Sequence, residues 1–279
     1  MKRKNIISIV SSTYRITLLT LSWAITCLTA CTKDLDLDFK EAEPLYVVEA
    51  ELDNQRTRIA VNKTRAMNSS EAKTGVDGAV ITISGSDGSL QTLTRSVNGI
   101  YSSTGKGKAG VRYDIVVEVE GQRFTSSSVM QRTPVIKSLR FVWKKMLSTR
   151  MLFADLRFDD FSHETNYFFM HLYRNGVGYR WAVLKDNVNS NGELQQLFNC
   201  MTEDTDDGDD DKLLDGDNVR MELRAIDKAS YDYLHSLQEM GHVASNPIAN
   251  FSGGCLGYFS AYGKATHSLV FSYADVEEE

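Results

Sequence analysis

One pattern recurs through residues 44–133: short segments in which apolar and polar residues alternate, separated by turns that contain glycine. Every second residue is apolar in the segment that begins at Tyr46, and the segment that ends at Val119 repeats this pattern. Successive side chains of a β-strand point to opposite faces, so the alternation predicts strands with one buried face. Asp77-Gly78 and Asn98-Gly99 are typical of tight hairpin turns. The pattern therefore predicts an antiparallel β-sandwich.

A second alternating region occupies residues 134–279. Pro134 separates the two regions, because proline fixes the backbone and interrupts strand pairing. Asn175-Gly176 marks another hairpin. One stretch differs, since apolar residues at helical spacing follow Asp227, whose side chain can cap a helix over residues 228–240. We therefore expect a mainly all-β chain of two antiparallel β-sandwich-like domains, with one short helix near the C-terminus.

Residues 1–30 have the form of a lipoprotein signal peptide. Four basic residues, the last of them Arg15, precede an uncharged apolar stretch that is shorter than the ~20 residues a membrane-spanning helix needs. The stretch ends in Leu28-Thr29-Ala30-Cys31, the pattern that a lipoprotein signal peptidase cleaves. We therefore expect Cys31 to carry a covalent lipid that anchors the chain in a membrane. A plain transmembrane anchor and a cleaved leader without lipid are the alternatives.

Residues 31–43 are expected to form an acidic tether between the lipid and the first domain. The alternation of Lys33, Asp34, Asp36 and Asp38 resembles the Lys-Asp-rich export signal that Bacteroidota lipoproteins carry after the lipidated cysteine. That resemblance implies an outer-membrane location that faces the cell surface. An unstructured tether with no sorting role is the alternative.

The charge of the chain bears on its partners. The formal net charge is −6, and loss of the four basic residues in the leader takes it to −10. An acidic surface disfavours nucleic acid and electrostatic attraction to anionic lipid. We therefore expect no nucleic-acid partner and attribute the membrane contact to the lipid on Cys31.

Two of the four cysteines, Cys200 and Cys255, remain once Cys27 leaves with the leader and Cys31 takes the lipid. An even number of cysteines in an exported chain suggests pairing, so we expect a Cys200–Cys255 disulfide. Two unrelated buried thiols are the alternative. The sequence has no Cys-Xaa-Xaa-Cys motif and no Cys/His cluster, which argues against a structural zinc site.

Acidic residues crowd around Gly208. Calcium prefers oxygen ligands at alternating positions around a glycine turn, which makes Asp204, Asp206 and Asp209 candidate calcium ligands. The spacing is not that of an EF-hand, and no glutamate occupies its closing position. A solvated loop is the alternative, in which case the chain carries no cofactor beyond its covalent lipid.

No catalytic motif stands out. Ser252 lies beside two glycines, but not in the Gly-Xaa-Ser-Xaa-Gly order of a nucleophile elbow. Asp159 and Asp160 are adjacent, so on a strand they would point to opposite faces and make a poor acid/base pair. His171 lies in an aromatic strand, which favours a structural role. We expect no enzyme activity.

Several phrases spread along the chain point to one family. They are Leu45-Tyr46-Val47-Val48-Glu49, Phe158-Asp159-Asp160, Asp211-Lys212-Leu213-Leu214-Asp215-Gly216, the segment 231–237, and Gly253-Gly254-Cys255-Leu256-Gly257-Tyr258-Phe259. Together with the lipidated cysteine, they resemble the Bacteroidota lipoprotein family catalogued as domain of unknown function 4249. Within the first domain, residues 78–113 also resemble transthyretin-like and carboxypeptidase-regulatory-like sandwich modules.

Members of that lipoprotein family typically occur beside TonB-dependent outer-membrane transporters of the starch-utilisation type. The resemblance therefore implies an accessory or capture subunit for such a β-barrel, with no catalytic residues to carry over and no known ligand. A structural or adhesive envelope protein without a transporter partner is the alternative. A capture role predicts exposed aromatic residues, for which Trp143, Tyr179 and Trp181 are candidates, although core packing is the other fate of each.

Overall fold

The computed structural model describes residues 43–65, 74–147, 149–161, 164–186, 192–202, 212–240 and 246–279. By their contacts, the residues from 43 to 279 form one compact unit. All the helices and strands that the structure describes belong to this unit. Among the described residues, no helix is long and apolar enough to cross a membrane.

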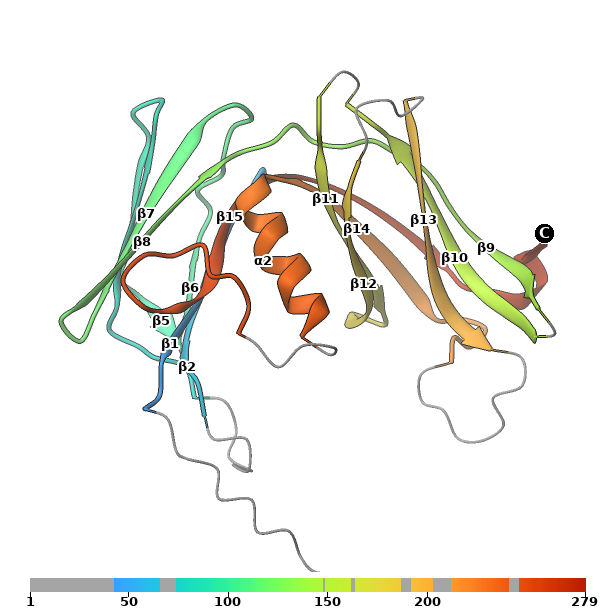
Figure 1. The fold of residues 1–279 in the computed structure, drawn as a ribbon, viewed down its shortest axis with the longest axis horizontal. Helices are drawn as coiled ribbons and strands as arrows, with labels where there is room; N and C mark the ends of the chain where they lie inside the picture. The colour runs from blue at the N-terminus through green and yellow to red at the C-terminus, as the bar shows by residue number, and fades with distance from the viewer. Residues whose placement is uncertain are drawn as a thin grey trace, which may run out of the picture. The chain divides into compact units, whose positions relative to one another are not determined.

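Eight strands of the described residues form one sheet, in the order β12-β11-β14-β15-β1-β2-β6-β5 (Figure 1). Its members are β1 (Tyr46–Asp53), β2 (Thr57–Lys63), β5 (Ser96–Val97), β6 (Ile100–Ser103), β11 (Tyr167–Arg174), β12 (Val177–Lys185), β14 (Asn218–Ile226) and β15 (Leu256–Val270).

Two smaller sheets occur in the same residues, in the orders β4-β3-β7-β8 and β13-β10-β9-β16. The first contains β3 (Val80–Gly85), β4 (Leu90–Leu93), β7 (Arg112–Val119) and β8 (Gln122–Val129). The second contains β9 (Ile136–Met146), β10 (Thr149–Asp159), β13 (Glu193–Thr202) and β16 (Glu277–Glu278). The helix α2 (Lys228–Glu239) and a 3₁₀ turn (Tyr273–Asp275) complete the described elements.

β15 joins the two halves of the chain. Its first part pairs in parallel with residues 47–53 of β1, and its second part, residues 263–270, pairs antiparallel with β14. Since β1 precedes the expected boundary at Pro134 and β14 follows it, the eight-stranded sheet is continuous across that boundary. The expected domains 44–133 and 134–279 therefore share a sheet.

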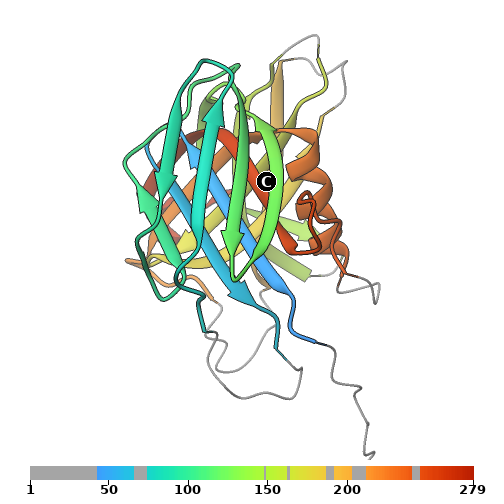
Figure 2. The ribbon, with the colours of Figure 1, turned by 90° about the vertical axis from the view of Figure 1, so that its left-hand side faces the viewer.

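The two large hydrophobic cores pack on the same face of this sheet. In β15, Phe259 and Ala261 belong to the first core, and Leu269, which points to the same side, packs against the second. The β4-β3-β7-β8 sheet closes the first core through residues such as Ile81, and the β13-β10-β9-β16 sheet closes the second through residues such as Leu156. In Figure 2 the green and teal strands of the smaller first sheet lie in front of the blue strands of the larger one.

The prediction of a mainly β fold with one short helix is confirmed. α2 follows Asp227, whose carboxylate accepts a hydrogen bond from the backbone N–H of Ser230 at 2.9 Å, as a helix N-cap does. Among the described strands, two pairs, β1 with β15 and β9 with β16, are parallel rather than antiparallel. Neither pair is joined by a hairpin, because the later strand returns from the far end of the chain.

The predicted Cys200–Cys255 disulfide is wrong, because both residues are buried thiols. Cys200 packs in the second core, where its Sγ donates a hydrogen bond to the carbonyl oxygen of Phe198 at 3.4 Å. Cys255 packs in the first core. Thiols in different cores cannot reach the ~2 Å separation of a disulfide. Burial raises the pKa of the Cys255 thiol to about 11, which keeps it protonated and unreactive.

Candidate functional site

The face of the eight-stranded sheet opposite the two large cores carries a pocket of about 680 Å³, which we call the sheet pocket. Side chains of five neighbouring strands, β11, β14, β15, β1 and β2, line it, together with the turn between β1 and β2. α2 packs on the adjoining part of the same face through Tyr233 and Leu234. The charged residues of the pocket are Glu49, Glu51, Arg56, Arg58, Arg220, Glu222, Arg224 and Lys264.

Strand register explains why these charges share a face. Arg224 lies opposite Lys264 in the pair of β14 with β15. Glu51 lies opposite Ser260 of β15 on one side and opposite Arg58 of β2 on the other. Residues that are directly opposite in a sheet project to the same side. The charged residues of β14 alternate with apolar residues that pack in the second core.

Arg224 holds the centre of the pocket floor. Its Nη1 donates to Oε1 of Glu51 at 2.6 Å, and its Nε donates to Oε1 of Glu222 at 2.7 Å. Its guanidinium also lies over the rings of Phe169 and Tyr262, at 5.1 and 4.5 Å from the ring centroids. Arg224 is only 7% exposed. A buried guanidinium held from two sides by carboxylates is fixed in position, so the floor is preorganised.

The charges of this centre are stabilised against burial. Burial alone would raise the pKa of Glu51, but the Arg224 guanidinium more than offsets this, and the pKa lies below its ordinary value. The hydroxyl of Tyr258 donates to the same carboxylate oxygen at 3.3 Å. Burial raises the pKa of that hydroxyl well above its ordinary value, so Tyr258 stays a donor. Glu51 is therefore an ionised acceptor at neutral pH, with Oε1 held by both Arg224 and Tyr258.

A second buried ion pair shapes the edge of the pocket. Nζ of Lys264 lies 2.6 Å from Oδ2 of Asp53. The other carboxylate oxygen of Asp53 accepts from the backbone N–H groups of Gln55 and Arg56, at 2.6 and 2.8 Å. Asp53 thus fixes the turn between β1 and β2, which carries Gln55 and Arg56 to the rim.

A stack of cationic and aromatic groups lines another side. The Arg220 guanidinium lies 3.9 Å from the ring centroid of Tyr173, and its Nη1 donates to Oε2 of Glu222 at 3.0 Å. The imidazole ring of His171 also stacks on the ring of Tyr173, with centroids 4.1 Å apart. Burial, followed by repulsion from Arg224, lowers the pKa of His171 to about 4. His171 is therefore neutral at pH 7.

The rim carries unmatched positive charge. The guanidinium groups of Arg56 and Arg58 form no hydrogen bond or ion pair with any residue in the part of the chain that the structure describes. Glu51, the cross-strand neighbour of Arg58, is engaged by Arg224 instead. Glu49 is the one lining carboxylate without an ion pair among the same residues. Among the described residues, the pocket lining thus includes two cations and one carboxylate without an ion pair.

This arrangement suits a small anionic solute. Arginine binds carboxylate and phosphate groups through paired N–H donors, and such bonds strengthen where water is partly excluded. The volume of about 680 Å³ lies within the ~300–1,000 Å³ usual for small-molecule sites. The described residues contain no group of three or more His, Cys, Asp or Glu side chains placed to hold a metal ion.

The residues singled out from the sequence lie elsewhere. Cys31 and the calcium candidates Asp204, Asp206 and Asp209 fall outside the described residues, so those predictions stay predictions. Cys200 and Cys255, the expected disulfide partners, pack in separate cores on the opposite face of the sheet.

The aromatic candidates do not line the pocket. Trp143 packs against the second core, and Trp181 packs against the cluster beneath α2. The hydroxyl of Tyr179 donates to the carbonyl oxygen of Cys200 at 2.6 Å. The sequence does contain a signal for the pocket, the alternation of Arg220, Glu222 and Arg224 along one strand. Sequence reasoning missed it, because such an alternation is also typical of an ordinary solvated strand face.

Comparison with known proteins gives the chain a family. The model of the family described as Domain of unknown function (DUF4249) matches residues 32–268. The chain belongs to the DUF4249 family. No curated protein matches this DUF4249 chain. Among solved structures, the two-domain fibronectin type-III segment of chicken tenascin is 12% identical and matches with a TM-score of 0.23. That match covers 82% of this chain and 100% of the tenascin segment.

Proposed function

We propose that this DUF4249 chain is a surface-exposed outer-membrane lipoprotein that captures an anionic solute in the sheet pocket for a TonB-dependent β-barrel transporter. The leader that ends in Leu28-Thr29-Ala30-Cys31 supports the lipid anchor. The Lys-Asp-rich segment after Cys31 supports exposure at the cell surface.

The unmatched guanidinium groups of Arg56 and Arg58, above the ion-paired floor, carry the capture role. An arginine without a carboxylate partner is ready to bind one from a ligand, because no internal ion pair has to break first. The chain as a whole is acidic, so cations gathered at one pocket also focus an anion there.

The role is binding rather than catalysis. A general base needs a side chain, most often a histidine or a carboxylate, that can take up a proton at working pH. Glu51 and Glu222 are both held by Arg224, and the pKa of Glu51 is lowered. His171 has a pKa of about 4, so it is too weak a base to take up a proton at neutral pH, and its ring is stacked on Tyr173.

The partnership is tested by purifying a tagged full-length chain from its own host in mild detergent and identifying what comes with it by mass spectrometry. A TonB-dependent barrel in near-equal amount is the expected result. A chain that comes alone from solubilised membranes at every detergent concentration would refute the transporter role.

The anchor is tested separately, by feeding cells an alkyne-bearing palmitate and following the label. The wild-type chain is expected to incorporate it, and Cys31→Ser to lose it. Cys27→Ser is the matched control, because Cys27 leaves with the leader and the label should remain. Label in Cys31→Ser, or none in the wild type, would rule out the lipid at Cys31.

A structural or adhesive envelope role is the second candidate. It requires a strand edge that can pair with a neighbour, and β12, nine residues long, is the terminal strand of the eight-stranded sheet. Ordered polymers of the purified full-length chain, seen by electron microscopy and abolished by a proline in β12, would favour this role over capture.

A further inference from the structure

β16 is the edge strand of the β13-β10-β9-β16 sheet, which lies across the second core from the eight-stranded sheet. β16 pairs in parallel with Val142 and Trp143 of β9, and Figure 1 marks the C-terminus beside β9. The backbone N–H of Glu279 donates to the carbonyl oxygen of Trp143 at 3.0 Å. We call residues 277–279 the acidic end strand.

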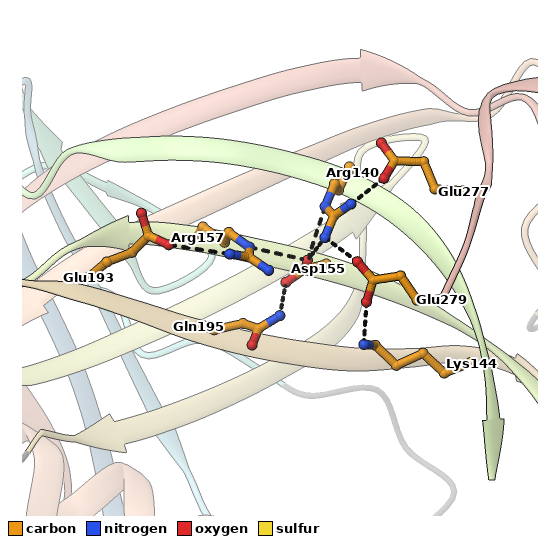
Figure 3. A network of polar contacts seen from close by, with 8 residues as sticks. All are labelled: Arg140, Lys144, Asp155, Arg157, Glu193, Gln195, Glu277 and Glu279. Atoms are coloured by element: carbon orange, nitrogen blue, oxygen red, sulfur yellow. Dashed lines mark hydrogen bonds and ion pairs between the residues drawn. The ribbon is translucent and has the colours of Figure 1, made fainter. Parts of the chain in front are cut away.

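Each glutamate of the acidic end strand meets a basic side chain of β9 or β10. Glu277 pairs with Arg140, and Glu278 pairs with Arg150. Glu279 bridges Arg140 and Lys144, with both oxygen–nitrogen distances at 2.5 Å (Figure 3). Three successive acids therefore lie on a basic surface, although the chain as a whole is acidic.

The buried carboxylate of Asp155 positions the arginines of this basic surface. Asp155 of β10 is 0% exposed, although its neighbours along the strand, and not Asp155 itself, point into the second core. Its Oδ2 accepts from Nε and Nη2 of Arg140 at 3.1 and 3.0 Å and from Nε of Arg157 at 3.4 Å (Figure 3). Gln195 donates to its Oδ1 at 2.7 Å. Asp155 thus holds Arg140 in a position from which Nη1 and Nη2 also donate to Glu277 and Glu279.

The acidic end strand uses only part of this edge. β9 has eleven residues, and β16 pairs with two of them. No other strand pairs with β9 on that side within the described residues. The side chain of Glu278 is 70% exposed, and exposed ion pairs contribute little. A longer strand would keep the carboxylate contacts and add backbone hydrogen bonds along β9.

We propose that the β9 edge, with Arg140, Lys144 and Arg150, is a docking site for an extended acidic segment of a partner protein, and that residues 277–279 occupy it until such a segment displaces them. The charge complementarity and the Asp155 support favour an acidic partner, and the parallel pairing of β16 sets its direction. The site is independent of the sheet pocket, which lies on the eight-stranded sheet.

The test uses a fluorescent peptide with the sequence of residues 272–279, Ser-Tyr-Ala-Asp-Val-Glu-Glu-Glu, and full-length protein in mild detergent. Fluorescence anisotropy should show that a chain ending at Val276 binds the peptide at least about tenfold more tightly than the intact chain, a gap of ~1.4 kcal/mol. The same peptide with glutamine at its last three positions should bind at least about tenfold more weakly.

Variants separate docking from general attraction. In the shortened chain, Arg140→Ala should weaken peptide binding about tenfold, whereas Arg123→Ala, which removes an exposed ion pair on β8, should leave it unchanged. Should the shortened chain not fold, the triple variant Glu277→Gln, Glu278→Gln, Glu279→Gln keeps the length and empties the basic surface.

Equal binding of the acidic and glutamine peptides, or no binding to either emptied chain, would overturn the proposal. Sedimentation that shows the intact chain as a dimer, and the shortened chain as a monomer, would replace the partner protein with a second copy of this chain and so overturn the choice of occupant.

Discussion

Glu51 and Arg224 meet on the floor of the sheet pocket at 2.6 Å, although 173 positions separate them in the sequence and β15 lies between their strands. The bond spans a central strand, so it ties β1 to β14 and one half of the chain to the other. Because Arg224 is buried, its guanidinium cannot turn to water when Glu51 is removed and keeps only its contact with Glu222 among its carboxylate partners.

Glu51→Gln should therefore lower the free energy of unfolding by about 3 kcal/mol, the lower end of the range for breaking a buried ion pair, since the Glu51 side chain is 22% exposed. Urea unfolding of the variant measures this. Glu118→Gln removes an exposed carboxylate paired with Arg123 and should change stability by less than ~1 kcal/mol. Equal effects of the two substitutions would contradict the assignment.

Acid should weaken the fold partly through His171. Its pKa is lowered from 6.5 to about 4, so the unfolded chain takes up this proton first as the pH falls. The contribution of neutral His171 to the free energy of unfolding is complete above pH 6.5 and is lost as the pH falls from 6.5 to about 4. His171→Gln should therefore flatten the fall in unfolding free energy over that interval. An NMR titration that places the midpoint of His171 near 6.5 would contradict this prediction.

The cysteines should behave as thiols. Denatured wild-type chain should react at both Cys200 and Cys255 with a thiol reagent, without prior reduction. Reductant should leave the melting temperature of the native chain unchanged, since no disulfide constrains the unfolded state. Native Cys255 should resist alkylation at pH 8, because burial holds its pKa near 11. A melting temperature that falls on reduction would restore the predicted disulfide.

Local signals accounted for much of the fold. Alternation and Asn-Gly turns predict the hairpin of β11 and β12, and Asn175 and Gly176 adopt the positive φ angles, 51° and 82°, that such a turn requires. The cap at Asp227 likewise predicts where α2 begins. Both features depend on residues that are close in sequence.

Long-range pairing was not predictable in this way. The parallel register of β1 with β15 joins Val47 to Leu256, and no local pattern encodes such a partner. The sheet pocket depends on that register, since it brings Glu51 next to the strands that carry Arg224. The expected disulfide failed for the same reason: the count of cysteines contains no information about which core each one enters.

A thermal-shift measurement of the full-length chain in mild detergent, with glucuronate, citrate and phosphate as anions and glucose as the neutral control, tests the capture role most directly. At least one anion is predicted to raise the melting temperature of the wild type, and glucose is predicted to leave it unchanged. The double variant Arg56→Ala, Arg58→Ala breaks no ion pair among the described residues, so its free energy of unfolding should lie within about 0.5 kcal/mol of the wild-type value. The anion should no longer raise the melting temperature of this variant. No shift from any anion, or the same shift in the double variant, would contradict anion capture by the sheet pocket.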